Sequence, residues 1–352
     1  MTMEKADMRI KAIDAITGGE VLAEAIMNDK KNVLIPAGTV LKVEYIPLIQ
    51  SFGIDSIMIE DPYENFEEPN PLLEPSRFYS YVERVKRILE KHIYHGEGSL
   101  HEIEVIAHEI VKEVNEISSE AIFDMNERTA DLYEHTVMVS LLSVMVAKKL
   151  KLDEKKKFNI AVGCLLHDIG IRYITIPYEN RNMESGDPIQ IFEYKKHTIL
   201  GYSALEEEWI PEISKKMVLS HHEKQDGTGF PMRQKNKEIE CKIIQAVDAF
   251  DCYISGMEHE RTFVREAIEK IVDEAGTGYE QKIIEQLVSM IARYPVGTTV
   301  KTNKEEKGVV ISQTNDPESP IIMIIQTEDK KEKKDKKYNL MLEKNISILQ
   351  VV

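Results

Sequence analysis

The chain has 352 residues, of which 42% are hydrophobic and 30% are charged, and its formal net charge is −16. This composition is typical of a globular protein and excludes a largely disordered chain. The acidic balance argues against a broad surface for nucleic acid or anionic membrane, so we expect neither partner. The three cysteines form no CxxC pair, and no apolar run approaches the ~20 residues that cross a bilayer. Together with the lack of a secretory signal at the start of the chain, these features predict a cytoplasmic location.

The N-terminal 62 residues are predicted to form a small α+β accessory unit. Short strands are expected at Val21–Ile26, Asn32–Ile35 and Ile54–Ile59. A short helix is expected within Lys42–Phe52, although Pro47 weakens it. Residues 63–75 are rich in proline and acidic residues, which is the composition of a linker.

Helical periodicity begins at Ser76 and continues for about 220 residues. One helix, ending near Leu150, carries Asp131 and His135 four residues apart on one face. Aspartates or prolines then mark the starts of three further helices at Asp153, Asp187-Pro188 and Pro211. We therefore predict a helical domain over residues 76–295.

The hydrophobic period changes to two after Tyr294-Pro295. Five short strands are predicted, at Thr299–Lys301, Val309–Ser312, Ile321–Gln326, Tyr338–Met341 and Ile346–Gln350. The mixed-charge run Thr327–Lys337 is expected to be a solvated hairpin loop. The predicted fold class is therefore mainly α, with a small C-terminal β module over residues 296–352.

Eight residues of the helical region are of the types that ligate divalent metals and could face one cavity: Asp131, His135, His167, Asp168, His197, His221, His222 and Asp248. Imidazole and carboxylate together suit Fe, Mn, Zn and similar ions. These residues would fill the shell of one ion twice over, so the sequence predicts two ions, with a third as an extension. A bridged pair of ions can lower the pKa of a shared water and clamp an in-line displacement at phosphorus.

The ordinary alternative is that these side chains are satisfied helix residues. His135 or His197 alone would be better explained in that way. The pairs His167-Asp168 and His221-His222 favour a site, because packing gives no reason to end the apolar run Val162–Leu166 with His-Asp. In that pair Asp168 is well placed to bridge two ions.

The order of these motifs resembles the HD superfamily of metal-dependent phosphohydrolases, specifically its HD-GYP branch. LLHDIG (165–170) is similar to the HDIG core of that family, KKHTILG (195–201) to its KHPxxG, and HHEKQDGTGFP (221–231) to its HHExxDGxGYP. AVDAFDCYIS (246–255) is similar to its last ligand helix. The resemblance covers roughly residues 131–275. It implies a two- or three-metal phosphodiesterase that hydrolyses cyclic di-GMP or a related cyclic dinucleotide by attack of a metal-bridging hydroxide on phosphorus.

On this resemblance, His135, His167, Asp168 and Asp248 hold one ion, while His197, His221 and His222 hold the other. Asp131 supports a third ion or orients His135. The catalytic pair is His167 and Asp168. Fe or Mn is the expected metal, with Zn, Ni or Mg as alternatives. The expected substrate contacts are Lys196, Asp226, Gly227, Gly229, Phe230, Arg172 and Arg261.

The sequence departs from the family pattern where the substrate phosphates are expected to bind. The family lysine after HDIG is replaced by Ile171, and the signature tyrosine by Phe230. In the turn after Ser255, where the family is basic, only Arg261 is basic with certainty. Two alternatives to a cyclic-dinucleotide phosphodiesterase therefore stay open: a catalytically weak sensor or interaction module, and a hydrolase of another phosphate ester. Contact with a signalling protein through the GTGFP loop, and a homodimer, are further expectations.

Overall fold

The computed structural model describes residues 8–13, 16, 20–27, 33–42, 45–54, 56–60, 67, 69–95, 100–125, 130–177, 179, 181–183, 185–327 and 336–352. The chain divides into two compact units, one comprising residues 1–70, 122–125 and 292–352 and the other comprising residues 71–121 and 126–291. Within the described ranges, no helix is both long and apolar enough to cross a membrane. Parts of the predicted linker and of the charged run at 327–337 lie outside the described residues.

The N-terminal part of the first unit contains two small antiparallel pairs of strands and a short helix. β1 (Met8–Ala12) pairs with β4 (Ser56–Glu60), and β2 (Ile26–Met27) pairs with β3 (Val33–Ile35). Helix α1 (Ile46–Ser51) has its proline in the first turn, where a missing N–H costs nothing, so Pro47 starts the helix rather than weakening it. β1 was not predicted from the sequence.

The C-terminal part of the first unit is an antiparallel five-stranded sheet in the order β8-β7-β6-β5-β9. Its strands are β5 (Thr299–Thr302), β6 (Lys307–Ser312), β7 (Ile321–Gln326), β8 (Lys337–Asn339) and β9 (Ile348–Val351). Successive residues of β6 alternate between two apolar clusters, with Val310 in one and Val309 and Ile311 in the other. Both faces of this strand are therefore buried, which explains its continuous apolar sequence.

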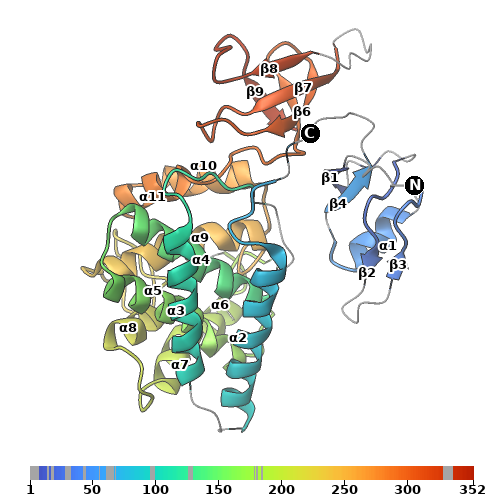
Figure 1. Ribbon diagram of the computed structural model, residues 1–352. Helices are drawn as coiled ribbons and strands as arrows, with labels where there is room; N and C mark the ends of the chain where they lie inside the picture. The colour runs from blue at the N-terminus through green and yellow to red at the C-terminus, as the bar shows by residue number, and fades with distance from the viewer. Residues whose placement is uncertain are drawn as a thin grey trace. The chain divides into compact units, whose positions relative to one another are not determined.

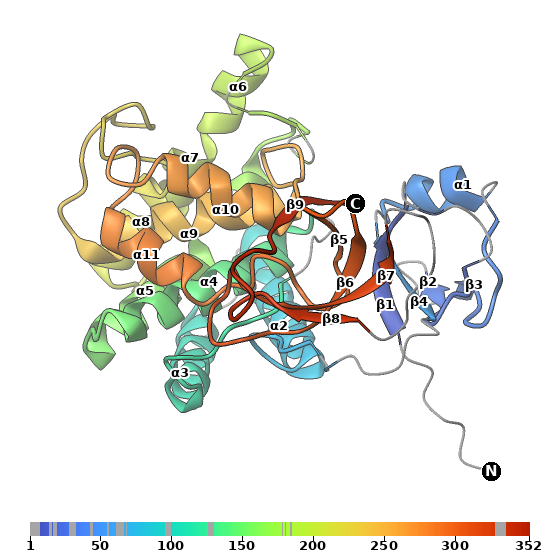
Figure 2. The same ribbon diagram turned by 90° about the horizontal axis from the view of Figure 1, so that it is seen from above.

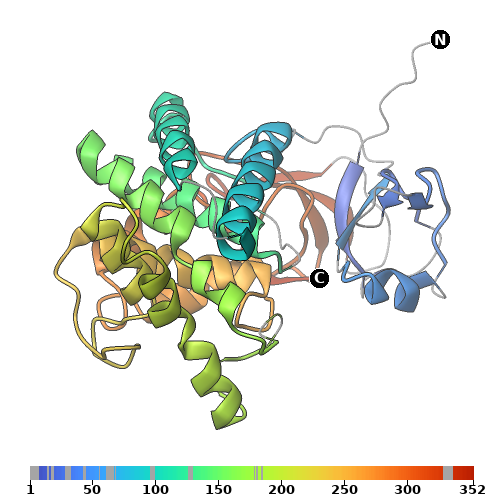
Figure 3. The ribbon, with the colours of Figure 1, turned by 90° about the horizontal axis from the view of Figure 1, so that it is seen from below.

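The second unit is helical (Figure 1). It consists of α2 (Pro75–His95), α3 (His101–Glu116), α4 (Leu132–Lys149), α5 (Glu154–Leu166), the 3-10 helix η3 (Ile169–Tyr173), α6 (Pro188–Lys195), α7 (His197–Ala204), α8 (Glu212–Ser220), α9 (Ile239–Ser255), α10 (Val264–Asp273) and α11 (Gln281–Val288). Helix α4 is buried on most sides, because it packs against α2, α3, α5, α9 and α11. Figure 3 shows α2 and α3 along one side of this unit. The predicted fold class is confirmed.

Three helices start with an aspartate cap, and those of α5 and α6 were predicted from the sequence. The carboxylates of Asp131, Asp153 and Asp187 accept backbone N–H groups in the first turns of α4, α5 and α6. The segment after Asp187 forms two short helices rather than one, because the chain turns at Lys196 between α6 and α7. Helix α6 projects from the rest of its unit in Figure 2.

Two glycines allow η3 and α7 to approach each other at backbone distance. A Cβ atom on Gly170 would lie 1.9 Å from the carbonyl oxygen of His197 and 2.6 Å from the amide nitrogen of Gly201. No side chain fits at Gly170 of the HDIG-like motif, and its close neighbour Gly201 is the glycine of the KHPxxG-like motif. Close packing of the two segments therefore explains why both motifs contain a glycine. This contact holds the segment after Asp168 against the start of α7, which carries His197.

Candidate metal centre

Five helices bring the predicted histidine and aspartate ligands into one buried cluster. His135 lies in α4, His167 and His221 end α5 and α8, His197 begins α7, and Asp248 lies in α9. Asp168 and His222 each follow a histidine at a helix end. The side chains of these ligands are 10% exposed or less. The structure thus places seven of the eight predicted metal ligands together.

Three of the histidines are held by the last turn of the preceding helix. Nδ1 of His167 lies 2.7 Å from the carbonyl oxygen of Cys164, and Nδ1 of His197 lies 2.8 Å from that of Tyr194. Nδ1 of His221 lies 2.8 Å from the carbonyl oxygen of Val218. A helix leaves its last four carbonyls without intrahelical partners, so each imidazole satisfies one of them. Because a carbonyl only accepts, Nδ1 carries the proton and Nε2 of the neutral ring presents its lone pair to the cluster.

His135 is held by a carboxylate that the sequence analysis did not assign to the site. Its Nδ1 donates to Oδ2 of Asp251 at 2.7 Å, and both side chains are fully buried. Asp248 and Asp251 are three residues apart in α9, so they share one helix face. That spacing on an otherwise apolar helix was the available signal. Asp251 therefore has the orienting role that was one of the two alternatives for Asp131.

Asp168 faces two groups of histidines with its two oxygens. Oδ1 lies 3.5 Å from Nε2 of His221 and 3.7 Å from Nε2 of His197. Oδ2 lies 3.5 Å from Nε2 of His167 and 3.8 Å from Nε2 of His135. This is the arrangement of a carboxylate that bridges two ions.

Asp248 is placed in a similar way on the other side of His135. Its Oδ1 lies 3.0 Å from Nε2 of His135 and 3.3 Å from Nε2 of His167. Its Oδ2 lies 3.7 Å from Nδ1 of His222. The two oxygens of Asp248 thus also face different histidines.

The contacts within the cluster fit cations better than hydrogen bonds. Nε2 of His197 lies 3.1 Å from Nε2 of His221, and two unprotonated nitrogens cannot hydrogen-bond to each other. Oδ1 of Asp168 is buried and has no hydrogen-bond partner among the described residues. Ligand atoms bound at about 2.1 Å to one ion lie roughly 3.0–3.4 Å apart. The cluster is therefore able to hold divalent metal ions.

Burial favours the neutral imidazole at two histidines of the cluster, His197 and His222. Burial lowers the pKa of His197 to about 4 and that of His222 well below its usual value. Burial also lowers the pKa of His135, but the hydrogen bonds to Asp248 and Asp251 outweigh it and raise this pKa to about 10. Burial raises the pKa of Asp168, but the neighbouring histidines outweigh it and hold the carboxylate ionised. Neutral rings beside an ionised carboxylate are the state that metal binding requires.

The structure gives Asp131 a place outside the cluster. Its Oδ1 accepts the backbone N–H groups of Tyr133 and Glu134, both at 2.9 Å, as the N-cap of α4. Asp131 belongs to none of the groups of described residues whose ligand atoms lie within 4.8 Å of one another. In the structure, Asp131 is therefore the N-cap of α4 and does not lie beside the other seven predicted ligands.

Glu258 lies in the cluster although no motif or spacing indicates it. It is 7% exposed, and its Oε1 lies 3.5 Å from Nδ1 of His222. Burial, followed by the charges of Asp248 and Asp168, raises the pKa of Glu258 well above its usual value. The position of Glu258 depends on the turn after α9, where Gly256 and Glu258 itself have positive φ angles. Periodicity does not predict such a turn.

The cluster opens into a cavity of about 310 Å³. Of the predicted substrate contacts, Gly229 and Phe230 line it, and the ring of Phe230 stacks on His222 with centroids 4.5 Å apart. Among the described residues, the lining does not include Lys196, Arg172, Arg261, Asp226 or Gly227. Lys195 lines the cavity instead, with its Nζ 4.8 Å from the centroid of the Phe230 ring. The adjacent Lys196 pairs with Glu193 and is 41% exposed.

Buried Glu223 holds the loop that carries Phe230. Its carboxylate accepts the backbone N–H groups of Met232 and Gln234. A Cβ atom on Gly229 would lie 2.3 Å from the carbonyl oxygen of His222, so the loop folds back directly onto the ligand pair. Glu223 therefore fixes the loop whose residues Gly229 and Phe230 line the cavity.

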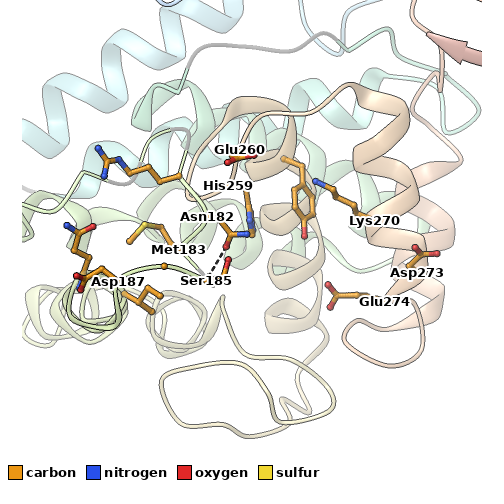
Figure 4. Close-up of a pocket in the computed structure, with 14 residues that line it drawn as sticks. Asn182, Met183, Ser185, Asp187, His259, Glu260, Lys270, Asp273 and Glu274 are labelled. Carbon is orange, nitrogen blue, oxygen red and sulfur yellow. Dashed lines mark hydrogen bonds between the residues drawn. The ribbon is translucent and has the colours of Figure 1, made fainter.

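A second cavity of about 830 Å³ adjoins the first, because Met183 and His259 line both (Figure 4). The rings of Tyr253 and His259 stack with centroids 4.5 Å apart, and Nζ of Lys270 lies 4.5 Å from the Tyr253 centroid. Asp187, Glu260, Asp273 and Glu274 add acidic groups to the wall. The metal cluster thus opens toward a larger space of mixed charge.

Residues 109–283 match a family model described as HD domain. The chain is an HD-domain protein. The resemblance inferred from the motifs is confirmed, and curated relatives are named cyclic di-GMP phosphodiesterases. The matched residues include all eight predicted metal ligands, and seven of these lie in the cluster described above.

The HD-domain protein is similar to a cyclic di-GMP phosphodiesterase of Pseudomonas aeruginosa, with 26% identity over 51% of this chain and 44% of the relative. It is also similar to a 3'3'-cGAMP-specific phosphodiesterase of Vibrio cholerae, with 23% identity over 67% of this chain and 43% of the relative. The chain spans about half the length of the curated relatives it matches. A solved HDG"Y"P protein from Bdellovibrio bacteriovorus aligns with a TM-score of 0.49 and 17% identity over 80% of this chain and 98% of its own.

Proposed function

We propose that this HD-domain protein is a metal-dependent phosphodiesterase that hydrolyses a cyclic dinucleotide. The observation that carries the proposal is Asp168, whose two oxygens face two separate groups of histidine Nε2 atoms in a buried cavity. Two cations bound side by side with an open cavity above them suit an in-line displacement at phosphorus. The names of the curated relatives support a phosphodiester as the substrate.

Two groups of side chains would hold the ions. His135, His167, Asp168 and Asp248 would hold one, and Asp168, His197, His221 and His222 would hold the other. Mixed imidazole and carboxylate ligands favour iron or manganese, with zinc, nickel or magnesium as alternatives. When bound, such ions supply Lewis acidity to the phosphoryl oxygens and acidify water. His167 and Asp168 remain the proposed catalytic pair.

Lys195 is the basic residue best placed to bind a substrate phosphate. The other lysine that lines the metal cavity, Lys224, pairs with Glu274 at 2.8 Å. Within the described part of the chain, Lys195 has no carboxylate within salt-bridge distance, and its ammonium lies over the Phe230 ring. Since Ile171 replaces the family lysine and is buried, Lys195 would supply the positive charge instead.

The two adjoining cavities have room for a dinucleotide. The metal cavity, at about 310 Å³, is at the small end of ligand sites, whereas the adjoining cavity measures about 830 Å³. One phosphodiester would lie at the metal cluster beside Lys195. The rest of the ligand would extend past Met183 and His259, which line both cavities.

The test is hydrolysis by protein loaded with Mn²⁺ or, without oxygen, Fe²⁺. Cyclic di-GMP and 3'3'-cGAMP are supplied separately, and the products are followed by chromatography. We expect a linear dinucleotide or mononucleotides from at least one substrate, and at least a thousandfold lower rate for Asp168→Asn. An Asp168→Asn rate equal to wild type would contradict the proposed centre. Fully loaded protein that turns over neither substrate would contradict the activity.

A ligand sensor without turnover is the second candidate. Few basic side chains line the metal cavity, and Lys196, Arg172 and Arg261 do not. Binding of labelled cyclic di-GMP by loaded protein, without product after prolonged incubation, would favour the sensor. Turnover of a simpler diester alone, such as bis(4-nitrophenyl) phosphate, would instead favour another phosphate ester.

The expected contact with a signalling protein at the GTGFP loop concerns only part of that loop. Thr228 is exposed, whereas the ring of Phe230 stacks on His222. Phe230 would therefore shape the cavity, and Thr228 would be the residue accessible to a partner. This contact and the homodimer stay predictions.

A further inference from the structure

Lys224 is a basic residue of the metal cavity whose charge is paired with an acid of the second cavity. Lys224 lines the metal cavity, and Glu274 lines the adjoining one. Nζ of Lys224 lies 2.8 Å from Oε2 of Glu274, and the two side chains are 19% and 33% exposed. The ion pair therefore joins the walls of the two cavities in which we propose that the dinucleotide binds.

Backbone contacts fix the positions from which the two side chains of this ion pair reach each other. The N–H of Gln225 donates to the carbonyl oxygen of Gly278 at 2.8 Å, which ties the loop that carries Lys224 to the turn after α10. In that turn the carbonyl oxygen of Glu274 accepts the N–H groups of Gly278 and Tyr279. A Cβ atom on Gly278 would lie 2.4 Å from Oε2 of Glu274, so a larger residue would require this carboxylate to move.

The ammonium of Lys224 is able to change partner without movement of the backbone. A lysine carries its charge on a flexible stem of four carbons. Nζ of Lys224 lies 5.5 Å from the centroid of the Tyr279 ring, and Tyr279 also lines the metal cavity. A partly exposed ion pair contributes little stability in water, so a phosphate that enters the metal cavity is a sufficient competitor for Glu274.

The charges of the proposed substrate call for a second basic residue. A cyclic dinucleotide has two phosphodiesters with one negative charge each, and the metal ions and Lys195 would meet one of them. The wall of the second cavity contains four acidic residues and two basic ones, so it disfavours the other phosphate. Lys224 is the other lysine that lines the metal cavity and is placed for that role.

We propose that Lys224 binds the second phosphate of the dinucleotide and that Glu274 competes with this phosphate for the ammonium. This inference rests on the proposed function and extends it. A ligand with two phosphodiesters displaces Glu274 and gains the contact with Lys224, whereas a ligand with one phosphodiester leaves the ion pair intact. The pair therefore selects ligands by their number of phosphates.

The test is a double-mutant cycle on Lys224 and Glu274 in the full chain loaded with Mn²⁺. The probe is the bis-phosphorothioate analogue of cyclic di-GMP, whose slow hydrolysis allows equilibrium binding to be measured. Lys224→Met should raise its dissociation constant about fivefold through loss of a charge-assisted contact. Glu274→Gln should lower it about threefold, because the ammonium loses its competing carboxylate. In the Lys224→Met protein, Glu274→Gln should have no effect.

Asp273→Asn is the matched control for the loss of charge. Asp273 is the neighbour of Glu274 in the chain and lines the same second cavity (Figure 4). Its replacement removes the same charge and should change the dissociation constant less than about twofold. The control ligand is phosphorothioate GpG, a linear dinucleotide with one phosphodiester. Lys224→Met should change its binding less than about twofold, whereas Lys195→Ala should weaken both ligands.

Equal tightening by Glu274→Gln with and without Lys224 would indicate a general field effect and overturn the inference. Unchanged binding of the cyclic analogue by Lys224→Met would also overturn it, as would an equal loss for both ligands. Wild type that binds neither analogue would overturn the proposed substrate itself. Circular dichroism checks folding, and if Lys224→Met does not fold, Lys224→Gln takes its place and must give the same pattern.

Discussion

The cavity floor and the cavity rim are built in different ways. The floor, meaning the clustered histidines and aspartates, is fixed by helix ends: three imidazoles each bind a carbonyl three residues earlier. The rim, meaning residues 181–183, 185–187, 224–231 and 256–261, consists of turns and loops held by contacts between segments, such as the N–H of Met183 to the carbonyl oxygen of Glu258. The floor is therefore set by local helix geometry, whereas the rim depends on how separate loops meet. Metal binding and substrate choice can consequently change independently.

The difference between floor and rim is tested most strongly by changing Asp251, which orients His135 in the floor but is not an expected ligand. We expect Asp251→Asn to weaken the metal held by the His135 group 10–100-fold, since carboxylates that orient a ligating imidazole have effects of that size. Titration against a chelator of known affinity measures the change. The metal held by His197 and His221 serves as the internal control, and equal weakening of both ions would contradict the assignment.

The rim is tested by two neighbouring lysines with different surroundings. Lys195→Ala should raise the dissociation constant for labelled cyclic di-GMP about tenfold, the loss of one charged hydrogen bond of about 1.5 kcal/mol. Lys196→Ala should change it less than twofold, because Lys196 pairs with Glu193 outside the cavity. Metal content should stay at the wild-type value in both. A larger effect at Lys196 would return the phosphate contact to the residue predicted from the sequence.

The smallest expected effect is that of Asp131→Ala. This variant distinguishes a structural role of Asp131 as a helix cap from a role as a metal ligand. Asp131→Ala should lower the free energy of unfolding by about 1 kcal/mol through loss of the N-cap of α4. Chemical denaturation measures this change. Asp153→Ala, which removes the corresponding cap of α5, is the matched control. A lower metal content in Asp131→Ala alone would restore this residue to the metal centre.

Much of the floor was predictable because four of its ligands occur as two pairs of adjacent residues, His167-Asp168 and His221-His222. His-Asp after an apolar run and His-His before a glycine loop have no packing explanation, so residue type alone indicated a site. Asp251 was missed although its spacing from Asp248 was an available signal, because only the fold shows which of these carboxylates meets Nδ1 of His135. Asp131 was predicted as a ligand because an acid four residues before His135 shares its helix face, and the structure places it at the cap of α4.

The rim could be predicted only in part. The chain turns at Lys196, and this break puts Lys195 rather than Lys196 into the cavity. Glu258 enters the cluster through a turn with positive φ angles that no period describes. In the first unit, by contrast, the strands of the C-terminal sheet were found, because short apolar runs between turn residues indicate buried strands.

The attachment of three imidazoles to helix carbonyls also bears on how quickly ions leave the protein. A histidine whose Nδ1–H is bound to the backbone cannot rotate away to release an ion unless it first breaks that bond. In the part of the chain that the structure describes, no backbone carbonyl anchors Nδ1 of His222, but the ring of Phe230 lies against this histidine. We therefore expect metal exchange to be slow and to be limited by opening of the loop over residues 224–231. The first ion to exchange with added isotope should be the one nearest His222.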